Sequence, residues 1–224
     1  VYLSYMNEIR GDLFGSIESV GFEGSKMKIL AALTRLRQIC CHPSTFLDNY
    51  KGGSGKLDLL MQQIDNAIAN EHRTLVFSQF TGMLEIIGRE LKEKGINYFY
   101  LDGSTPPEER LDMAKRFNGG ENDIFLISLK AGGTGLNLIG ADTVIHYDPW
   151  WNPAVEDQAT DRAYRIGQTQ NVYVLKLLTK GTIEEKIYKL QQKKKELSDS
   201  CLTGGEVFLG KLTREELEDI FSFD

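Results

Sequence analysis

The chain has 224 residues and a net charge of −6, because it contains 26 Lys and Arg against 32 Asp and Glu. Hydrophobic residues make up 41% of it, which is typical of a globular protein and excludes disordered, collagen-like and disulfide-scaffold chains. The longest apolar runs, such as 172–178, are far shorter than the roughly 18 residues of a membrane-spanning helix. Three cysteines, two of them adjacent, predict no disulfide framework, so we expect a reducing cytosol. A start at valine leads us to expect a fragment of a longer protein.

The first 50 residues show helical spacing without a strand signal. Apolar side chains recur every three or four residues between Met27 and Ile39. The next stretch, 51–55, reads Lys-Gly-Gly-Ser-Gly, a composition typical of flexible linkers. We therefore predict a helical segment over residues 1–50 and a linker over 51–55.

Between residues 56 and 181, short runs rich in β-branched and aromatic residues alternate with segments of helical period. This alternation predicts an α/β domain with a parallel sheet and crossover helices. The predicted strands are 74–78, 98–101, 124–128, 143–147 and 172–177. The predicted helices are 56–70, 83–94, 106–117, 136–139 and 153–164.

Two further helices begin with the pattern of a capping box, a threonine followed three residues later by a glutamate. The first covers residues 182–198 and carries Ile183 and Ile187 on one face, so we expect it to pack on the core. The second begins at Thr213 and is short and acidic. We interpret residues 199–224 as a peripheral tail.

Two glycine-rich stretches are candidates for phosphate-binding loops. Residues 53–56 read Gly-Ser-Gly-Lys, but Leu57 follows where a Walker A loop requires Ser or Thr, which excludes that loop. Residues 131–137 follow a predicted strand, and glycines such as Gly133 and Gly135 let backbone amides approach a ligand at the carboxyl edge of the sheet. On its own, this second stretch is equally typical of a tight turn.

The most informative segment carries two arginines and a glutamine at helical spacing. On a helix, Gln158, Arg162 and Arg165 lie at i, i+4 and i+7 and point the same way. A guanidinium binds phosphate oxygens bidentately and keeps its charge, so such a face suits a phosphate. Surface ion pairing with Asp157 or Asp161 is the alternative that spacing alone leaves open.

Six motifs, in this order along the chain, resemble the Swi/Snf family of superfamily-two ATPases. They are 36–43 (LRQICCHP), 76–80 (VFSQF), 101–105 (LDGST), 131–138 (AGGTGLNL), 148–153 (DPWWNP) and 161–168 (DRAYRIGQ). The chain looks like the C-terminal RecA-like lobe of such a motor, over about residues 30–195. The resemblance implies a three-layer lobe with a mainly parallel central sheet, preceded by a helical segment and followed by a bracing helix.

In that family, two RecA-like lobes close on one ATP and move the motor along double-stranded DNA without separating the strands. The resemblance implies that Arg162 and Arg165 are the arginine fingers that meet the γ-phosphate. It implies that Gln158 contacts the nucleotide or the other lobe. It also implies that Gly133 and Gly135 form the loop that couples the nucleotide state to DNA binding. The N-terminal lobe supplies the P-loop and the acids that hold Mg²⁺. We therefore expect an ATP hydrolase in the two-lobe protein and no ATPase activity from this chain alone.

The resemblance further implies DNA contacts by Ser78, Gln79, Lys130 and Trp151. Each lies at or just after the end of a predicted strand, where open α/β sheets bind their ligands. The acidic net charge leaves few phosphate contacts, so we expect weak, salt-sensitive binding to duplex DNA with little sequence preference. Lys130 stands where arginine is common in the family, and Tyr164 where histidine is common. These departures bear on DNA grip and finger positioning.

Two alternative functions stay open at this stage. One is the second lobe of an RNA helicase, although the Arg-Ile-Gly-Gln and Trp-Trp-Asn-Pro stretches favour the DNA motor. The other is a non-catalytic module that binds an anion or a protein through the same arginines. For the motor, the expected partners are the N-terminal lobe, double-stranded DNA and a protein cargo on that DNA, with no membrane. Its expected compartment is a prokaryotic cytoplasm or a eukaryotic nucleus.

Overall fold

The computed structural model describes residues 1–131, 135–165, 167–197 and 213–222. Contacts divide the chain into two compact units, which we call the sheet unit and the helical unit. The sheet unit consists of Gly55–Trp150 and Ala154–Leu177, and the helical unit of Val1–Ser54, Trp151–Pro153 and the described residues after Leu177. Within the described ranges, no helix is both long and apolar enough to cross a membrane.

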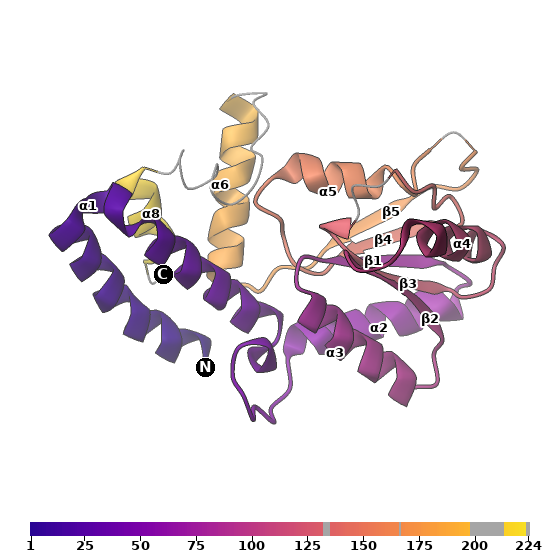
Figure 1. Cartoon of the computed structure of the whole chain (residues 1–224), viewed down its shortest axis with the longest axis horizontal. Coiled ribbons are helices and arrows are strands. Elements are labelled where there is room, and N and C mark those ends of the chain that lie inside the picture. The colour runs from indigo at the N-terminus through magenta and orange to yellow at the C-terminus, as the bar shows by residue number, and fades with distance from the viewer. Residues whose placement is uncertain (132–134, 166, 198–212, 223–224) are drawn as a thin grey trace. The chain divides into compact units, whose positions relative to one another are not determined.

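The sheet unit is built on parallel strands in the order β2-β3-β1-β4-β5 (Figure 1). The strands are β1 (Thr74–Ser78), β2 (Tyr98–Leu101), β3 (Ile124–Ser128), β4 (Thr143–His146) and β5 (Tyr173–Lys176). Every predicted strand is found, with bounds within one residue of the prediction. The predicted α/β architecture with a parallel sheet is confirmed.

Helices cover both faces of this sheet. They are α2 (Gly55–Ala69), α3 (Thr81–Glu93), α4 (Pro107–Asn118) and α5 (Pro153–Thr160). The first two lie on one face and the last two on the other (Figure 1). On the face of α4 and α5, Phe77 and Phe125 from neighbouring strands pack against Phe117 and Ala163. The three inner strands, β1, β3 and β4, are buried at every position, as a parallel sheet covered on both sides requires.

The predicted helix 136–139 is wrong, because residues 136–138 have no regular structure and 139–140 form a turn. The backbone of this stretch bonds to partners elsewhere in the unit instead of to itself. Leu138 N donates to Arg162 O at 2.9 Å, and Gly140 N donates to Asn118 Oδ1 at 2.9 Å. A helix would require those amides for its own hydrogen bonds.

The predicted extent of α5 is also wrong. The helix ends at Thr160, four residues before the predicted end at Tyr164, and a turn follows. Ala163 N donates to Thr160 O at 3.0 Å, a three-residue spacing that tightens the chain after the last helical turn. Arg162 and Arg165 therefore lie beyond the helix, and the predicted i, i+4, i+7 face does not form.

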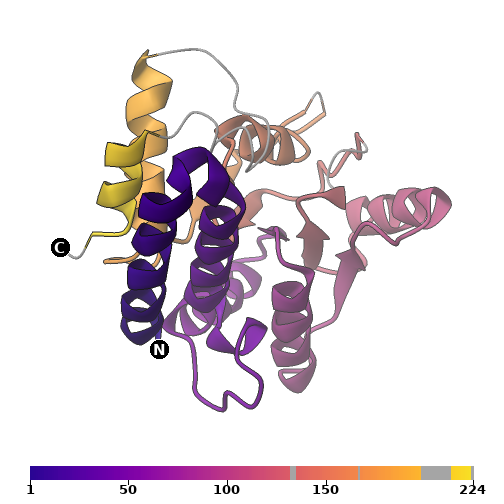
Figure 2. The same ribbon diagram turned by 60° about the vertical axis from the view of Figure 1, so that its left-hand side comes forward.

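The helical unit begins with a hairpin. α1 (Tyr2–Cys41) is interrupted at Gly21, whose φ of 78° and ψ of 169° suit a residue without a side chain. Hydrogen bonds nested around this glycine hold the two arms antiparallel (Figure 2). They join Ser16 Oγ to Ser25 Oγ at 3.2 Å, Lys28 Nζ to Asp12 O at 3.0 Å and Arg35 Nη1 to the Tyr5 hydroxyl at 3.4 Å. A 3₁₀ turn, η1 (Pro43–Thr45), follows the hairpin.

Two C-terminal helices pack on this hairpin. They are α6 (Ile183–Leu197) and α8 (Arg214–Ile220), and they contribute Ile183, Ile187 and Leu217 to a core shared with α1. The capping box predicted at Thr213 is present, with Glu216 as its second member. The predicted helices of the C-terminal region are confirmed in the described residues.

Candidate functional site

Arg162 is a charged residue of the sheet unit that is almost completely buried. It lies in residues 161–165, which we call the arginine loop, directly after α5, and only 2% of the residue is exposed. Its Nε and Nη1 atoms are buried and have no hydrogen-bond partner among the described residues. Burying a cation without a partner is costly, so such a group indicates a ligand that supplies the missing acceptors.

Arg165 lies in the same loop and is exposed. Its Nη1 donates to Gly135 O at 3.0 Å and its Nε to Asp161 O at 3.2 Å. Gly135 has a φ of +66°, the left-handed region that favours glycine. The structure thus brings the arginine loop to the glycine stretch, a contact that the sequence did not predict. The other predicted glycine, Gly133, lies outside the described residues.

The electrostatics of the arginine loop favour an anion. Burial lowers the pKa of the Arg162 guanidinium, and the neighbouring charge of Arg165 lowers it further. Among the described residues, no ion pair joins either arginine to Asp157 or Asp161, so the surface ion pairing left open above is not observed. Two adjacent positive charges with no ion pair among the described residues form a site that a phosphate would neutralise.

The base of the loop is held by a buried histidine that sequence reasoning assigned no role. His146 Nε2 lies 3.0 Å from Thr160 Oγ1, and the imidazole stacks on Phe77. Burial lowers the pKa of His146 to about 3, and Lys176 contributes to the shift. The histidine is therefore neutral at physiological pH and adds no charge beside the two arginines. Gln158, predicted to contact a nucleotide, is exposed on α5 one turn earlier in the sequence.

Three of the four predicted DNA-binding residues gather at the carboxyl ends of β1 and β3, which are neighbours in the sheet. Gln79 follows β1 directly, and Lys130 is exposed two residues after β3. Ser78 ends β1, is fully buried and donates its hydroxyl to Asp148. The other oxygen of Asp148 accepts from Gln79 N at 3.3 Å. Sequence reasoning missed Asp148, although its position after a predicted strand was a usable signal.

The fourth predicted DNA-binding residue, Trp151, belongs to the helical unit and is 4% exposed. The guanidinium carbon of Arg37 lies 4.4 Å from the centre of the indole ring, a cation–π contact. Gln191 Nε2 donates to Trp151 O at 2.7 Å. The structure therefore packs this side chain in the core of the helical unit, whereas the other three predicted DNA-binding residues belong to the sheet unit.

Comparisons with known proteins identify the family. The helicase conserved C-terminal domain family matches residues 55–167. The chain is 40% identical to the putative ATP-dependent helicase/translocase YwqA of Bacillus subtilis, over 98% of this chain and 24% of that protein. It is 39% identical to the nuclear protein STH1/NPS1 of Saccharomyces cerevisiae, over 88% of this chain and 15% of that protein. It spans about a quarter or less of these curated relatives.

Solved structures agree in fold. The C-terminal domain of the Sulfolobus solfataricus SWI2/SNF2 ATPase is 33% identical and superimposes with a TM-score of 0.80, over 99% of this chain and 92% of that domain. The core of the same ATPase in complex with double-stranded DNA gives 34% identity and a TM-score of 0.81, over 100% of this chain and 47% of that one. Motifs, fold and comparisons together show that the chain belongs to the helicase C-terminal domain family, as a RecA-like C-terminal lobe of the SWI2/SNF2 type.

Proposed function

We propose that the chain is the second motor lobe of a two-lobe, ATP-dependent double-stranded DNA translocase, in which Arg162 and Arg165 meet the γ-phosphate of ATP. The observation that carries this proposal is the buried guanidinium of Arg162, which has two nitrogen atoms without a partner among the described residues. Two similar structures, the core domain of the Sulfolobus solfataricus SWI2/SNF2 ATPase and the core of that ATPase in complex with double-stranded DNA, support the choice of substrate and of nucleic acid.

The chemistry asked of the two arginines is charge stabilisation. Phosphoryl transfer spreads negative charge over the γ-phosphate oxygens, and a planar guanidinium offers two parallel donors to them. Arg162 is desolvated in advance, so its charge acts at short range without reorganising water at the moment of transfer. In this proposal Gln158, Gly133 and Gly135 complete the nucleotide side of the site. We assign Mg²⁺ to acidic residues of the N-terminal lobe.

The proposed DNA surface is the carboxyl edge of β1 and β3. Lys130 and Gln79 are its contact residues, because the ammonium group of the first is exposed and the second directly follows β1. Ser78 and Trp151 have buried side chains, so they enter the proposal as residues that position neighbouring loops. Ser78 does so through Asp148, which also accepts a hydrogen bond from the Gln79 amide.

ATP turnover by the full-length protein tests the arginine roles. Replacement of Arg162 or Arg165 by alanine should lower DNA-stimulated kcat by about 10³-fold or more, whereas KM for ATP should change much less. Lysine should not rescue, because a point charge lacks the planar fork. Asp161→Ala is the matched control from the same loop and should retain most of the activity. Full activity in both alanine variants would reject the proposal.

DNA binding by the chain itself provides an independent measurement. We expect weak binding to duplex DNA that falls steeply between low and moderate salt, because few phosphate contacts oppose a net charge of −6. Lys130→Ala should weaken binding equally for different sequences. It should also reduce the slope of log K against log salt concentration by about one, because one fewer counterion is released. A strict preference for single strands or for duplex RNA would instead favour the RNA helicase alternative.

A further inference from the structure

A short segment joins the glycine stretch to β4, and its backbone is bound from several sides. Gly140 N donates to Asn118 Oδ1 at 2.9 Å, and Gly140 O accepts from Arg73 Nη1 at 3.2 Å. Asn118 Nδ2 also donates to Asn137 O at 2.9 Å, and Leu138 N donates to the backbone of Arg162 at 2.9 Å. Residues 137–141, which we call the strap, are therefore fixed without being helical.

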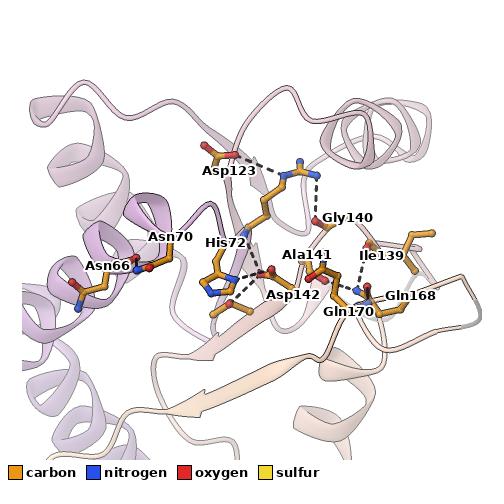
Figure 3. A network of polar contacts seen from close by, with 12 residues as sticks. Asn66, Asn70, His72, Asp123, Ile139, Gly140, Ala141, Asp142, Gln168 and Gln170 are labelled. Atoms are coloured by element: carbon orange, nitrogen blue, oxygen red, sulfur yellow. Dashed lines mark hydrogen bonds and ion pairs between the residues drawn. The ribbon is translucent and has the colours of Figure 1, made fainter.

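The side chain of Gln168 spans the strap and the arginine loop. Its Nε2 lies 3.1 Å from Ile139 O, 2.7 Å from Ala141 O and 3.3 Å from Ala163 O, so the two N–H groups of the amide are shared among three carbonyl oxygens. Its Oε1 accepts from Gln170 N at 2.9 Å, which fixes the orientation of the amide. Figure 3 shows Gln168 directed at Ile139 and Ala141.

These contacts flank the point where the strap meets Arg162. Leu138 and Arg162 are joined by a backbone hydrogen bond, and Gln168 bonds to the residue after each of them, Ile139 and Ala163. Asn118 and Arg73 hold the strap as well, but the structure shows no bond from either side chain to the described residues of the arginine loop. Gln168 is thus the side chain that joins the two backbones.

We propose that Gln168 is a positioning residue for Arg162. The proposal rests on the proposed function, in which the Arg162 guanidinium meets the γ-phosphate. That guanidinium has no hydrogen-bond anchor of its own at Nε or Nη1 in the described structure, so its direction depends on where the backbone holds it. Without the Gln168 amide, three carbonyl oxygens lose this donor, and among the hydrogen bonds of the described residues the one between Leu138 N and Arg162 O is left to hold the arginine loop to the strap.

The variants are Gln168→Met, which keeps the length of the side chain and removes both donors, and Gln170→Met as the matched control. Gln170 is exposed, and its contact with Gln168 uses only its backbone amide, so its side chain is not needed. In the full-length protein, Gln168→Met should lower kcat for ATP by roughly 10²-fold, the cost of a small misplacement of a catalytic group, with KM changed less than about threefold. The control should match wild type.

Hydrogen exchange separates this inference from the proposed function, because it requires no activity. In Gln168→Met, the amides of residues 137–141 and 161–165 should exchange faster than in wild type or in the control, while the amides of β1 and β3 stay equally protected. Gln168→Asn, one methylene shorter, should show the same effects at smaller size if the methionine variant does not fold.

Unchanged exchange in these two segments would overturn the inference, even if the protein hydrolyses ATP. The inference would also be overturned if the amides of β1 and β3 exchanged faster to the same extent as those of the two segments, because the fall in kcat would then reflect a general loss of stability. Faster local exchange in a protein whose wild type shows no ATP turnover would instead keep the structural link and reject the proposed function. Faster local exchange with unchanged kcat would show that Gln168 does not position Arg162 for the reaction.

Discussion

Two arginines of the sheet unit, the partly buried Arg73 and the buried Arg162, have different surroundings. Arg73 lies directly before β1 and donates to the carbonyl oxygens of Gly140 at 3.2 Å, of Asn122 at 2.9 Å and of Phe117. Its guanidinium also stacks on the Phe117 ring, with 4.3 Å between the guanidinium carbon and the ring centre. Arg162 has neither carbonyl partners at two of its nitrogen atoms nor an ion pair among the described residues.

The pKa of each guanidinium is lowered mainly by burial, and neighbouring charges oppose this shift only at Arg73. Burial lowers the pKa of both guanidiniums. The carboxylates of Asp123 and Asp142 act against this shift at Arg73, whereas Arg165 adds to it at Arg162. Arg73 therefore has acceptors and opposite charges around it, whereas the charge nearest to Arg162 is a second cation. This difference is why we propose a structural role for Arg73 and a ligand-binding role for Arg162.

The largest expected effect on stability is the loss of Arg73. Arg73→Met leaves three carbonyl oxygens without this donor, so the free energy of unfolding should fall by roughly 3 kcal/mol. Urea unfolding followed by circular dichroism measures the change. Arg116→Met is the matched control, because Arg116 is about half exposed, pairs with surface carboxylates and lies over the Phe99 ring, and the free energy of unfolding of this variant should fall far less than that of Arg73→Met. A loss at Arg73 no larger than in the control would remove the structural half of the comparison.

A third buried group, His146, extends the comparison to pH. Its pKa of about 3 in the folded chain lies below the ordinary value of 6.5, so unfolded molecules bind the proton first as the pH falls. The stability present above pH 6.5 is therefore lost progressively between pH 6.5 and 3, by about 2 kcal/mol at pH 5.

His146→Gln does not titrate in this range, so it should lose about 2 kcal/mol less than wild type between pH 7.5 and pH 5. Urea unfolding of both proteins at the two pH values gives the comparison. Equal losses of stability in wild type and variant would mean that the pKa of His146 in the folded chain is not lowered.

The smallest expected effect on stability is at Arg162. Arg162→Met removes a buried charge without an observed partner, so the free energy of unfolding should stay the same or rise by up to about 1 kcal/mol. The same unfolding experiment applies, and the result sharpens the contrast with Arg73→Met. A clear loss of stability would indicate that Arg162 has a structural role like that of Arg73.

Local sequence signals were sufficient for the sheet. Runs of β-branched and aromatic residues located all five strands to within one residue. The inner strands β1, β3 and β4 read as nearly continuous apolar runs because a parallel sheet covered on both faces buries every position. The same signals failed at residues 136–139 and 161–164. Helical spacing there was real, but the backbone amides of Leu138 and Gly140 bond to groups far away in the sequence. No local pattern reports such partners.

The candidate site divides along the same line. The sequence by itself determined which residue types are present: two arginines near a glycine stretch, and the motifs that resemble the Swi/Snf family. Tertiary structure alone decided that Arg162 is buried while Arg165 is exposed, that Trp151 packs in a core under Arg37, and that Gln168 joins two loops. Burial and long-range hydrogen bonds depend on where distant segments meet, whereas propensity and spacing depend only on neighbours along the chain.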